Sequence, residues 1–418
     1  MPPSTHSTAM WHDSTLGLWA HGYAWLPHHM RAASDGIVQT RLLGRPAIAL
    51  RGPEAVDFFY DEKHVVRTAA LPGADLDTLF GQGAVHTLDS DVYRVREALF
   101  LRLLKDEAGV AALGAPVGWR WREALADRHE EIVLFDEAAR VLARGVCDWA
   151  GLVLSEDAIS ELARDCTAMV DGFATPGPRH FRARRARRRQ EDAMASLLAE
   201  VRAAPEPEAN DSALEAVAWH RDANSEFLEL HTAAVELLNI IRPTVAVAWF
   251  ATFAAHALHR WPHHRELLRA DTEGHYARSF ANEVRRFYPF APFLVGLAAH
   301  DQTWRGHDIT KDSLVLLDLY GQNHDGTLWA HPYRFDPHRF SALAGFAPNA
   351  VLADLVPHGG GDPARDQRYP GEDVTVATLA ALATELARTE YSVPDQDLSI
   401  PLSRMPTLPR SGFRLRPN

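Results

Sequence analysis

The sequence has very few cysteines, and this scarcity excludes several classes of protein. Cys147 and Cys166 are the only two in a chain of 418 residues. Two cysteines cannot build a disulfide framework, and their spacing matches no zinc-binding pattern. We therefore expect both to pack as small buried hydrophobic residues, which is the common role of a free cysteine.

A targeting segment and an excess of positive charge are also lacking. The start, MPPSTHSTAMWHDSTLG, has neither the basic region nor the unbroken apolar stretch of a secretory signal. No later segment offers about 18 uncharged apolar residues. The formal net charge of −12 argues against broad nucleic-acid binding, which requires a basic face. We expect a cytoplasmic protein whose partners are small molecules and include no nucleic acid or membrane.

One run of arginines departs from this acidic balance. It reads RARRARRR from Arg182 to Arg189, is followed by acids, and lies in a helix-forming context. Isolated charge runs usually belong to the surface. A solvated helix face therefore explains the run better than a nucleic-acid site does.

The remaining pattern predicts a mainly α fold with small β-sheets. The composition, 46% hydrophobic and 23% charged, is ordinary for a globular protein with a large core. No fixed-period repeat or long linker is found, so we expect one continuous domain over residues 1–418. Residues 36–61 predict strands followed by a short helix, and residues 312–321 a further strand region. Helical periodicity dominates from about Asp136, and the longest apolar-rich helix covers residues 231–261.

Arg242 and Pro243 interrupt that long apolar helix. Proline removes a backbone hydrogen bond and arginine cannot lose its charge, so both are costly inside a core helix. A structural salt bridge is one explanation, because buried charges must be paired. We favour the other, an arginine that binds an anion beside a cavity.

Two later features also suggest a site. Glu283 and Arg286 stand at i and i+3 in SFANEVRRFYP, where they can form a buried ion pair on one helix face. The stretch VPHGGGDPARDQRYPGEDVT, residues 356–375, then combines three glycines and a Pro-Gly just before a helical segment. Such a loop lets the backbone approach a ligand closely.

Together these features resemble the cytochrome P450 family. The Glu-x-x-Arg pair, the DPHRF segment with Arg339, and the glycine-rich loop ending in RYPGE occur in its order and spacing. More narrowly, segments between residues 13 and 414 resemble the bacterial fatty-acid peroxygenases, among them TLFGQGAVHTLD, VELLNIIRPTVAVAWF and EVRRFYPFAPF. The resemblance implies the cytochrome P450 fold and haem b as cofactor, with Glu283, Arg286 and Arg339 in structural roles.

The resemblance also implies a way of using hydrogen peroxide. In that branch an arginine-proline pair, matched here by Arg242 and Pro243, replaces the acid-alcohol pair that activates dioxygen. Arg242 would then bind a substrate carboxylate over the iron, and this carboxylate would act as the acid-base group that splits peroxide, so no reductase is expected. A guanidinium can hold a carboxylate bidentately within reach of the peroxide proton. His86 falls at the position over the haem where the family has Gln or His. Pocket-lining positions fall on Phe80, Val85, Phe173, Phe290, Ala291 and Phe293, although core packing explains the apolar ones equally well.

The proximal side departs from the family pattern. The family's loop ends in Arg-Cys-Pro-Gly-Glu, whose cysteine thiolate ligates iron, whereas this chain has Arg368, then Tyr369, then Pro-Gly-Glu. Tyrosine is the proximal ligand of catalases, and a phenolate needs the metal or a nearby cation such as Arg368. The resemblance also places Arg67, Tyr93, Arg94 and Arg96 in the region that holds the haem propionates, where basic side chains can pair with carboxylates.

Three functions stay open on these grounds. The first is oxidation of a carboxylic acid by peroxide at a haem ligated by Tyr369. The second is peroxidase-like or catalase-like turnover, or a rearrangement without oxygen insertion. The third is a haem-inert protein that binds an acidic small molecule, in which Tyr369 only fills space.

Overall fold

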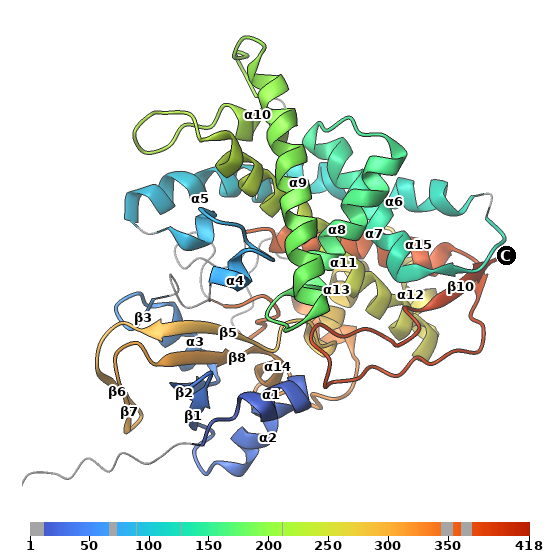
Figure 1. Cartoon of the computed structure of the whole chain (residues 1–418). Helices are drawn as coiled ribbons and strands as arrows, with labels where there is room; N and C mark the ends of the chain where they lie inside the picture. The colour runs from blue at the N-terminus through green and yellow to red at the C-terminus, as the bar shows by residue number, and fades with distance from the viewer. Residues whose placement is uncertain are drawn as a thin grey trace, which may run out of the picture.

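The computed structural model describes residues 12–66, 73–88, 90–126, 128–210, 212–343, 354–360 and 370–418. Most helices gather on one side of the molecule, and the largest sheet lies with the N-terminal helices on the other (Figure 1). The helices are α1 (Thr15–His21), α2 (Trp25–Ala32), α3 (Pro53–Tyr60), α4 (Gly73–Leu76), α5 (Ser90–Leu104), α6 (Glu107–Leu125), α7 (Leu134–Ala150), α8 (Glu156–Gly172), α9 (Pro178–Arg202), α10 (Ala213–Ala218), α11 (Leu230–Arg260), α12 (His263–Ala270), α13 (His275–Phe287), α14 (Leu319–Gln322) and α15 (Glu372–Arg388), with 3-10 turns η1 (Gly22–Ala24), η2 (Val85–Thr87) and η3 (Pro337–Leu343). The strands are β1 (Val38–Leu42), β2 (Arg45–Leu50), β3 (Val65–Val66), β4 (Ile132–Val133), β5 (Phe293–Ala298), β6 (Gln302–Trp304), β7 (His307–Ile309), β8 (Leu314–Asp318), β9 (Tyr391–Ser392) and β10 (Arg414–Pro417).

The largest sheet has five strands in the order β1-β2-β8-β5-β3. Strands β1 and β2 form an antiparallel hairpin whose two turn residues, Leu43 and Gly44, have φ of 51° and 77°. Two successive left-handed residues suit the right-handed twist of a hairpin. Strand β8 then pairs parallel with β2 and antiparallel with β5. The strands predicted within residues 36–61 and 312–321 are thus confirmed.

Alternating side chains cover both faces of this sheet. Ile48 and Leu50 point with Leu317 into a cluster that includes residues of α3. Ala47 and Ala49 point to the opposite face, where residues of α2 pack. This period of two is what a strand buried on both faces requires.

Helix α11 forms the centre of the helical part. It packs against α7, α8, α9 and α15, and nearly all of its residues from Ala233 to Leu258 are buried. Within the described ranges it is the one helix long and apolar enough to cross a membrane, and its apolar window is 94% buried inside the protein. The helix runs unbroken through Arg242 and Pro243, the two residues that interrupt its apolar pattern. Packing from four helices stabilises the turn in which proline removes one hydrogen bond.

Helices α5 and α6 begin well before Asp136, where we expected helical structure to become dominant. Helix α6 contains Gly109, Gly114, Pro116 and Gly118, which weaken its helical signal in the sequence. Close packing overrides that weakness. A Cβ added at Gly145 of α7 would lie only 2.7 Å from the side chain of Val117 in α6, so the two helices meet where one of them has no side chain.

Both cysteines are buried in the main helical core, as predicted. Burial raises the pKa of the Cys147 thiol to about 12. Such a thiol is inert at neutral pH, which is consistent with a packing role.

Candidate functional site

Three of the predicted site residues come together around Arg242. The Arg242 side chain is buried, with 7% exposure, and its guanidinium carbon lies 5.9 Å from the centroid of the Phe80 ring. Phe80 in turn packs edge-to-face on Phe173, with centroids 5.7 Å apart. The residues reach this point from α11, from the segment after α4, and from the residue that follows α8. A cation beside two aromatic rings can bind an anion that carries an apolar chain.

The side of α11 that carries Arg242 is the side that solvent reaches. Arg242 and Ala246 retain 7% and 6% exposure and Pro243 is half-buried, whereas Ile241 and Val245 are fully buried. Residues 242, 243 and 246 adjoin one another on the surface of a helix with 3.6 residues per turn. This strip is therefore less completely covered than Ile241 and Val245 beside it.

A second aromatic group lies further along α11. The Phe290 ring packs 4.8 Å from Phe250 of α11 and 5.8 Å from His358, and the Tyr23 hydroxyl donates to the Phe290 carbonyl at 2.6 Å. Phe250 is eight residues from Arg242, or about 12 Å along the helix. These contacts place Phe290 in the aromatic packing beside Phe250, away from the buried cation, and its role as a pocket-lining residue stays a prediction.

The neighbours of Phe290 pack elsewhere. Ala291 packs against the cluster between the sheet and α3, and Phe293 packs against the cluster on the opposite face. Both are half-buried, as a pocket-lining residue can be. Their contacts with the sheet favour the packing explanation over the pocket explanation.

Two polar residues of α11 hold the backbone of the segment that contains Phe80 and Val85. The Val85 amide donates to Glu236 Oε1 at 2.8 Å, and Asn239 Nδ2 donates to the Phe80 carbonyl at 2.8 Å. Both side chains are buried one to two turns before Arg242. His86 follows Val85 in η2, and its side chain lies outside the described residues. The segment is thus fixed to the helix that carries the cation.

Arg187 of α9 is buried, although we expected the run of arginines from Arg182 to Arg189 to form a solvated helix face. It is 1% exposed, its Nε donates to Glu191 at 2.6 Å, and its Nη1 donates to the Leu79 carbonyl. Burial lowers the pKa of Arg187, and the Glu191 carboxylate acts in the opposite direction. The signal was present in the sequence, because Ala183, Ala186, Arg187 and Gln190 share the helical spacing of one buried face.

The predicted propionate cluster does not form on one face. Arg96 is buried and donates to Glu236 Oε1 at 2.6 Å. Arg94, whose side chain is 72% exposed, pairs with Asp91 at the surface, and the Tyr93 hydroxyl donates to a nearby glutamate of the same helix. Residues 94 and 96 project from different sides of α5, because i and i+2 do not face each other on a helix. Arg94 and Arg96 thus meet protein carboxylates on different sides of α5, and their roles toward haem stay predictions. Arg67, Arg368 and Tyr369 lie outside the described residues.

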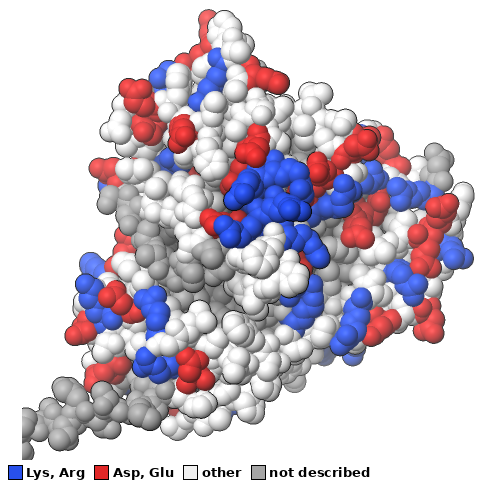
Figure 2. Space-filling model, in the orientation of Figure 1, with Lys and Arg blue, Asp and Glu red and all other residues white. Residues whose placement is uncertain are grey.

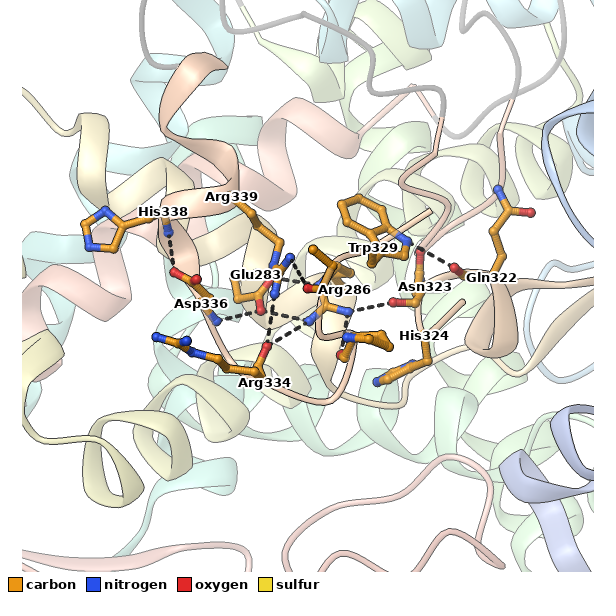
Figure 3. A network of polar contacts seen from close by, with 12 residues as sticks. Glu283, Arg286, Gln322, Asn323, His324, Trp329, Arg334, Asp336, His338 and Arg339 are labelled. Atoms are coloured by element: carbon orange, nitrogen blue, oxygen red, sulfur yellow. Dashed lines mark hydrogen bonds and ion pairs between the residues drawn. The ribbon is translucent and has the colours of Figure 1, made fainter. Parts of the chain in front are cut away.

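Glu283 and Arg286 form the expected buried ion pair on α13. Arg286 Nε and Nη2 donate to the two carboxylate oxygens at 2.7 and 2.8 Å, and neither side chain is exposed. Arg339 Nε lies 3.2 Å from the same carboxylate, and the Asp336 amide donates to it at 2.8 Å (Figure 3). Glu283 thus joins α13 to the segment around η3.

This network continues to the start of the glycine-rich loop. Arg286 Nη1 donates to the Asn323 carbonyl at 2.6 Å (Figure 3). The Asn323 side-chain oxygen accepts from the Val356 amide at 3.1 Å, and the Gly360 amide donates to the Tyr60 hydroxyl at 3.2 Å. Residues 354–360 are thereby attached to both the helical part and the sheet part.

The residues after the loop are fixed as well. Glu372, the first residue of α15, pairs with buried Arg285 of α13. Asp373 accepts from Lys105 at 2.7 Å, while burial raises the pKa of its carboxyl and Lys105 opposes this rise. The chain on either side of residues 361–369 is thus held by ion pairs and hydrogen bonds.

Solved structures of known proteins match this chain over nearly its whole length, and a family match covers part of it. The cytochrome P450 family matches residues 272–361. The structure resembles cytochrome P450SP alpha (CYP152B1) with a TM-score of 0.90, at 38% identity over 97% of this chain and 98% of that one. P450EX alpha (CYP152N1) with myristic acid gives 0.88 at 34% identity over 97% and 96%. A variant of P450 OleT with arachidonic acid gives 0.90 at 31% identity over 98% and 97%.

Curated relatives match over shorter stretches. Pluviatolide synthase of Sinopodophyllum hexandrum is 35% identical over 78 residues, which is 18% of this chain and 16% of that protein. Salutaridine synthase of Papaver somniferum is 34% identical over 92 residues, 21% of this chain and 18% of that protein. The match thus spans less than a fifth of the length of these relatives.

The family's cofactor is haem b, and the described frame fits it. Ala246, one turn after Arg242, has a side chain small enough for a flat ring to approach α11 there, and residues 354–360 and α15 are anchored around the loop from which the family ligates iron. The propionate contacts fit only in part, because Arg94 and Arg96 already meet protein carboxylates. From its fold, its buried Glu283–Arg286 network and its relatives, the chain belongs to the cytochrome P450 family and is a haem-dependent oxidoreductase.

Proposed function

We propose that this protein uses hydrogen peroxide to oxidise a carboxylic acid that Arg242 holds over a haem ligated by Tyr369. The observation that carries the proposal is the position of Arg242, a buried cation beside Phe80 and Phe173 on the solvent-reached side of α11. Solved relatives are described as binding ibuprofen, myristic acid and arachidonic acid. All three ligands are carboxylic acids with a large apolar part, which matches a guanidinium flanked by aromatic rings.

Arg242 would position the substrate and its proton-transfer group together. Its charge is present at any working pH, and its guanidinium can hold a carboxylate through two parallel N–H···O bonds. The bound haem would supply the oxidising chemistry. The carboxylate would take a proton from the peroxide and return it, a role that needs it fixed within hydrogen-bond reach. Peroxide brings both oxygen and oxidising equivalents, so no dedicated reductase is expected.

Phe80 and Phe173 would hold the apolar part of the acid. Their rings are half-buried, so further apolar contact would remove area from water. Glu236 and Asn239 fix the backbone of the Phe80–Val85 segment and so keep this wall in place beside Arg242. We assign His86 no role in holding this wall.

Tyr369 is the residue we propose as iron ligand, because it occupies the cysteine position of the family's loop. Arg285 and Lys105 anchor the acids at the start of α15, three and four residues after Tyr369. A thiolate donates electron density that favours O–O cleavage, whereas tyrosine is the ligand of catalases. This substitution favours a second candidate, catalase-like consumption of peroxide without oxidation of the acid.

Arg242→Ala tests the proposed anchor. Binding of acids should weaken by about 2–5 kcal/mol, the cost of removing one partner of a buried charge pair. Methyl esters of the same acids should bind poorly to the unchanged protein. Haem content should stay the same, and Arg278→Ala, which removes an exposed arginine, serves as the matched control. Loss of haem with acid affinity intact would show that Arg242 meets a haem propionate instead.

Other expectations stay predictions under this proposal. They are a cytoplasmic location, one domain over residues 1–418, absence of a nucleic-acid partner, and haem-binding roles for Arg67 and Arg368. The haem-binding role of Tyr93, whose hydroxyl donates to a glutamate of its own helix, also stays a prediction.

A further inference from the structure

The first three turns of α9 carry an unusual amount of positive charge. Residues 178–189 contain seven arginines and no acid, in a chain whose net charge is −12. Four of these arginines pair with acids of neighbouring segments: Arg179 with Asp171, Arg184 with Asp77, Arg187 with Glu191, and Arg189 with Asp165. The other three are exposed and form no ion pair within the described ranges, namely Arg182, Arg185 and Arg188.

These three arginines share one face of the helix with an exposed aromatic ring. Phe181 is 66% exposed, and Arg185 and Arg188 stand four and seven residues after it, on the same side of the helix. Arg182 is also exposed and lies at the edge of this face, about 100° around the helix from Phe181. In Figure 2 the arginine side chains of α9 merge into one continuous blue area facing the viewer. We call Phe181, Arg182, Arg185 and Arg188 the α9 face.

The α9 face borders the aromatic wall of the candidate site. The backbone of Arg179 lies so close to Gly172 that a Cβ there would approach the Arg179 carbonyl to 2.4 Å, which fixes the start of α9 on the end of α8. Phe173 follows directly. On the other side, Arg184 pairs at 2.9 Å with Asp77, three residues before Phe80. Both rings of the wall are therefore tied to the helix that carries the α9 face.

We infer that the α9 face docks this protein on an anionic lipid surface, from which its acid substrate enters. Cations that flank an exposed aromatic ring are the composition of an interfacial anchor, in which the ring enters the apolar layer and the cations meet anionic headgroups. The negative charge of the rest of the chain would repel such a surface, so binding would be confined to this face. That the docked surface supplies the substrate rests on the proposed function, whereas the docking itself does not. The sequence-based expectation of no membrane partner rested on the lack of a spanning segment, which does not bear on a local surface.

A single-stranded nucleic acid is the competing partner, since bases also stack on exposed rings between cations. The position of the α9 face favours lipid. It adjoins residues that we propose to hold an apolar chain, and a lipid-embedded acid would need to travel only from the docked surface to that wall. Binding of a nucleic acid gives no reason for the α9 face to lie beside that wall.

Vesicle sedimentation of the haem-loaded protein tests the inference. Vesicles of phosphatidylcholine alone are compared with vesicles that contain equal amounts of phosphatidylcholine and phosphatidylglycerol. We expect binding only to the second kind, and a decrease of roughly a hundredfold for the triple variant Arg182→Gln, Arg185→Gln, Arg188→Gln, from the usual contribution of three arginines near an anionic surface. Phe181→Ser should weaken binding further. The matched control changes three exposed arginines elsewhere, Arg31→Gln, Arg102→Gln and Arg278→Gln, and should bind like the unchanged protein.

Several outcomes would overturn the inference. These are equal losses in the two triple variants, equal binding to both kinds of vesicle, or a single-stranded oligonucleotide that binds the α9 face while anionic vesicles do not. Arg242→Ala should dock normally, so failure of the proposed function would leave the vesicle result intact. Conversely, the α9 triple variant should bind a water-soluble acid as well as the unchanged protein does, so that loss of docking is separable from loss of the site.

Discussion

Replacing Glu283 by glutamine should destabilise the protein far more than an ordinary change of one surface charge. Glu283 accepts two hydrogen bonds from Arg286 at 2.7 and 2.8 Å and one from the Asp336 amide at 2.8 Å, and it lies 3.2 Å from Arg339 Nε. The variant would leave two arginines, one of them fully buried, without their carboxylate. Breaking a buried ion pair by removing one partner costs about 3–5 kcal/mol.

Thermal unfolding is the assay for this prediction. The entropy of unfolding is about 2 cal/mol/K per residue, so a chain of this length should lose about 3–6 °C in Tm for that cost. The matched control is Glu54→Gln, whose carboxylate pairs with Arg305 at 2.6 Å while 73% exposed. Exposed pairs contribute about 0–1 kcal/mol, so the control should lose about 1 °C or less. Equal Tm losses in the two variants would refute the idea that the Glu283 network holds the fold together.

Three further predictions address the site and its surroundings. Glu236→Ala should reduce the free energy of unfolding in urea by about 3–5 kcal/mol, because buried Arg96 loses its carboxylate partner. Adding Arg96→Met should restore part of the loss, and strictly additive losses in the double variant would contradict the pairing. Tyr369→Phe should abolish the charge-transfer band of the ferric haem, and an unchanged absorption spectrum would rule out Tyr369 as ligand. His324 has its pKa lowered to about 4 by burial, so its contribution to stability should be complete above pH 6.5 and decrease as the pH falls toward 4, because the unfolded chain then binds the proton more tightly. Urea titrations at pH 7 and pH 5 should show a smaller difference for His324→Asn than for the unchanged protein, and an equal difference would contradict that assignment.

The strands and the central helix could be predicted from sequence because their patterns are strong. The apolar runs within residues 36–61 follow directly from a sheet that is buried on both faces. The apolar stretch over residues 231–261 corresponds to α11, which continues through Arg242 and Pro243. Local propensity is a weak prior when four helices pack around a segment. The same reason explains why the glycine-rich α6 was not predicted.

The site was predicted in part, and the failures concern which face of a helix a residue occupies. Arg242, Phe80 and Phe173 meet as expected because motif resemblance places them by position. Arg94 and Arg96 were assigned one role although residues at i and i+2 of a helix do not face each other. The burial of Arg187 was not predicted, because the run of arginines was interpreted as a whole. A count of charges does not record that one of them shares a face with buried alanines.

The most direct test of the central claim is a turnover experiment under argon. The haem-loaded protein is mixed with a long-chain carboxylic acid and hydrogen peroxide, without reductase or dioxygen, and the acid, its products and any evolved dioxygen are measured together. We predict that oxidised acid forms, that the methyl ester is not oxidised, and that Arg242→Ala abolishes the reaction while retaining haem. Consumption of peroxide with release of dioxygen and an unchanged acid would contradict the account and would show that Tyr369 has made this protein a catalase-like enzyme.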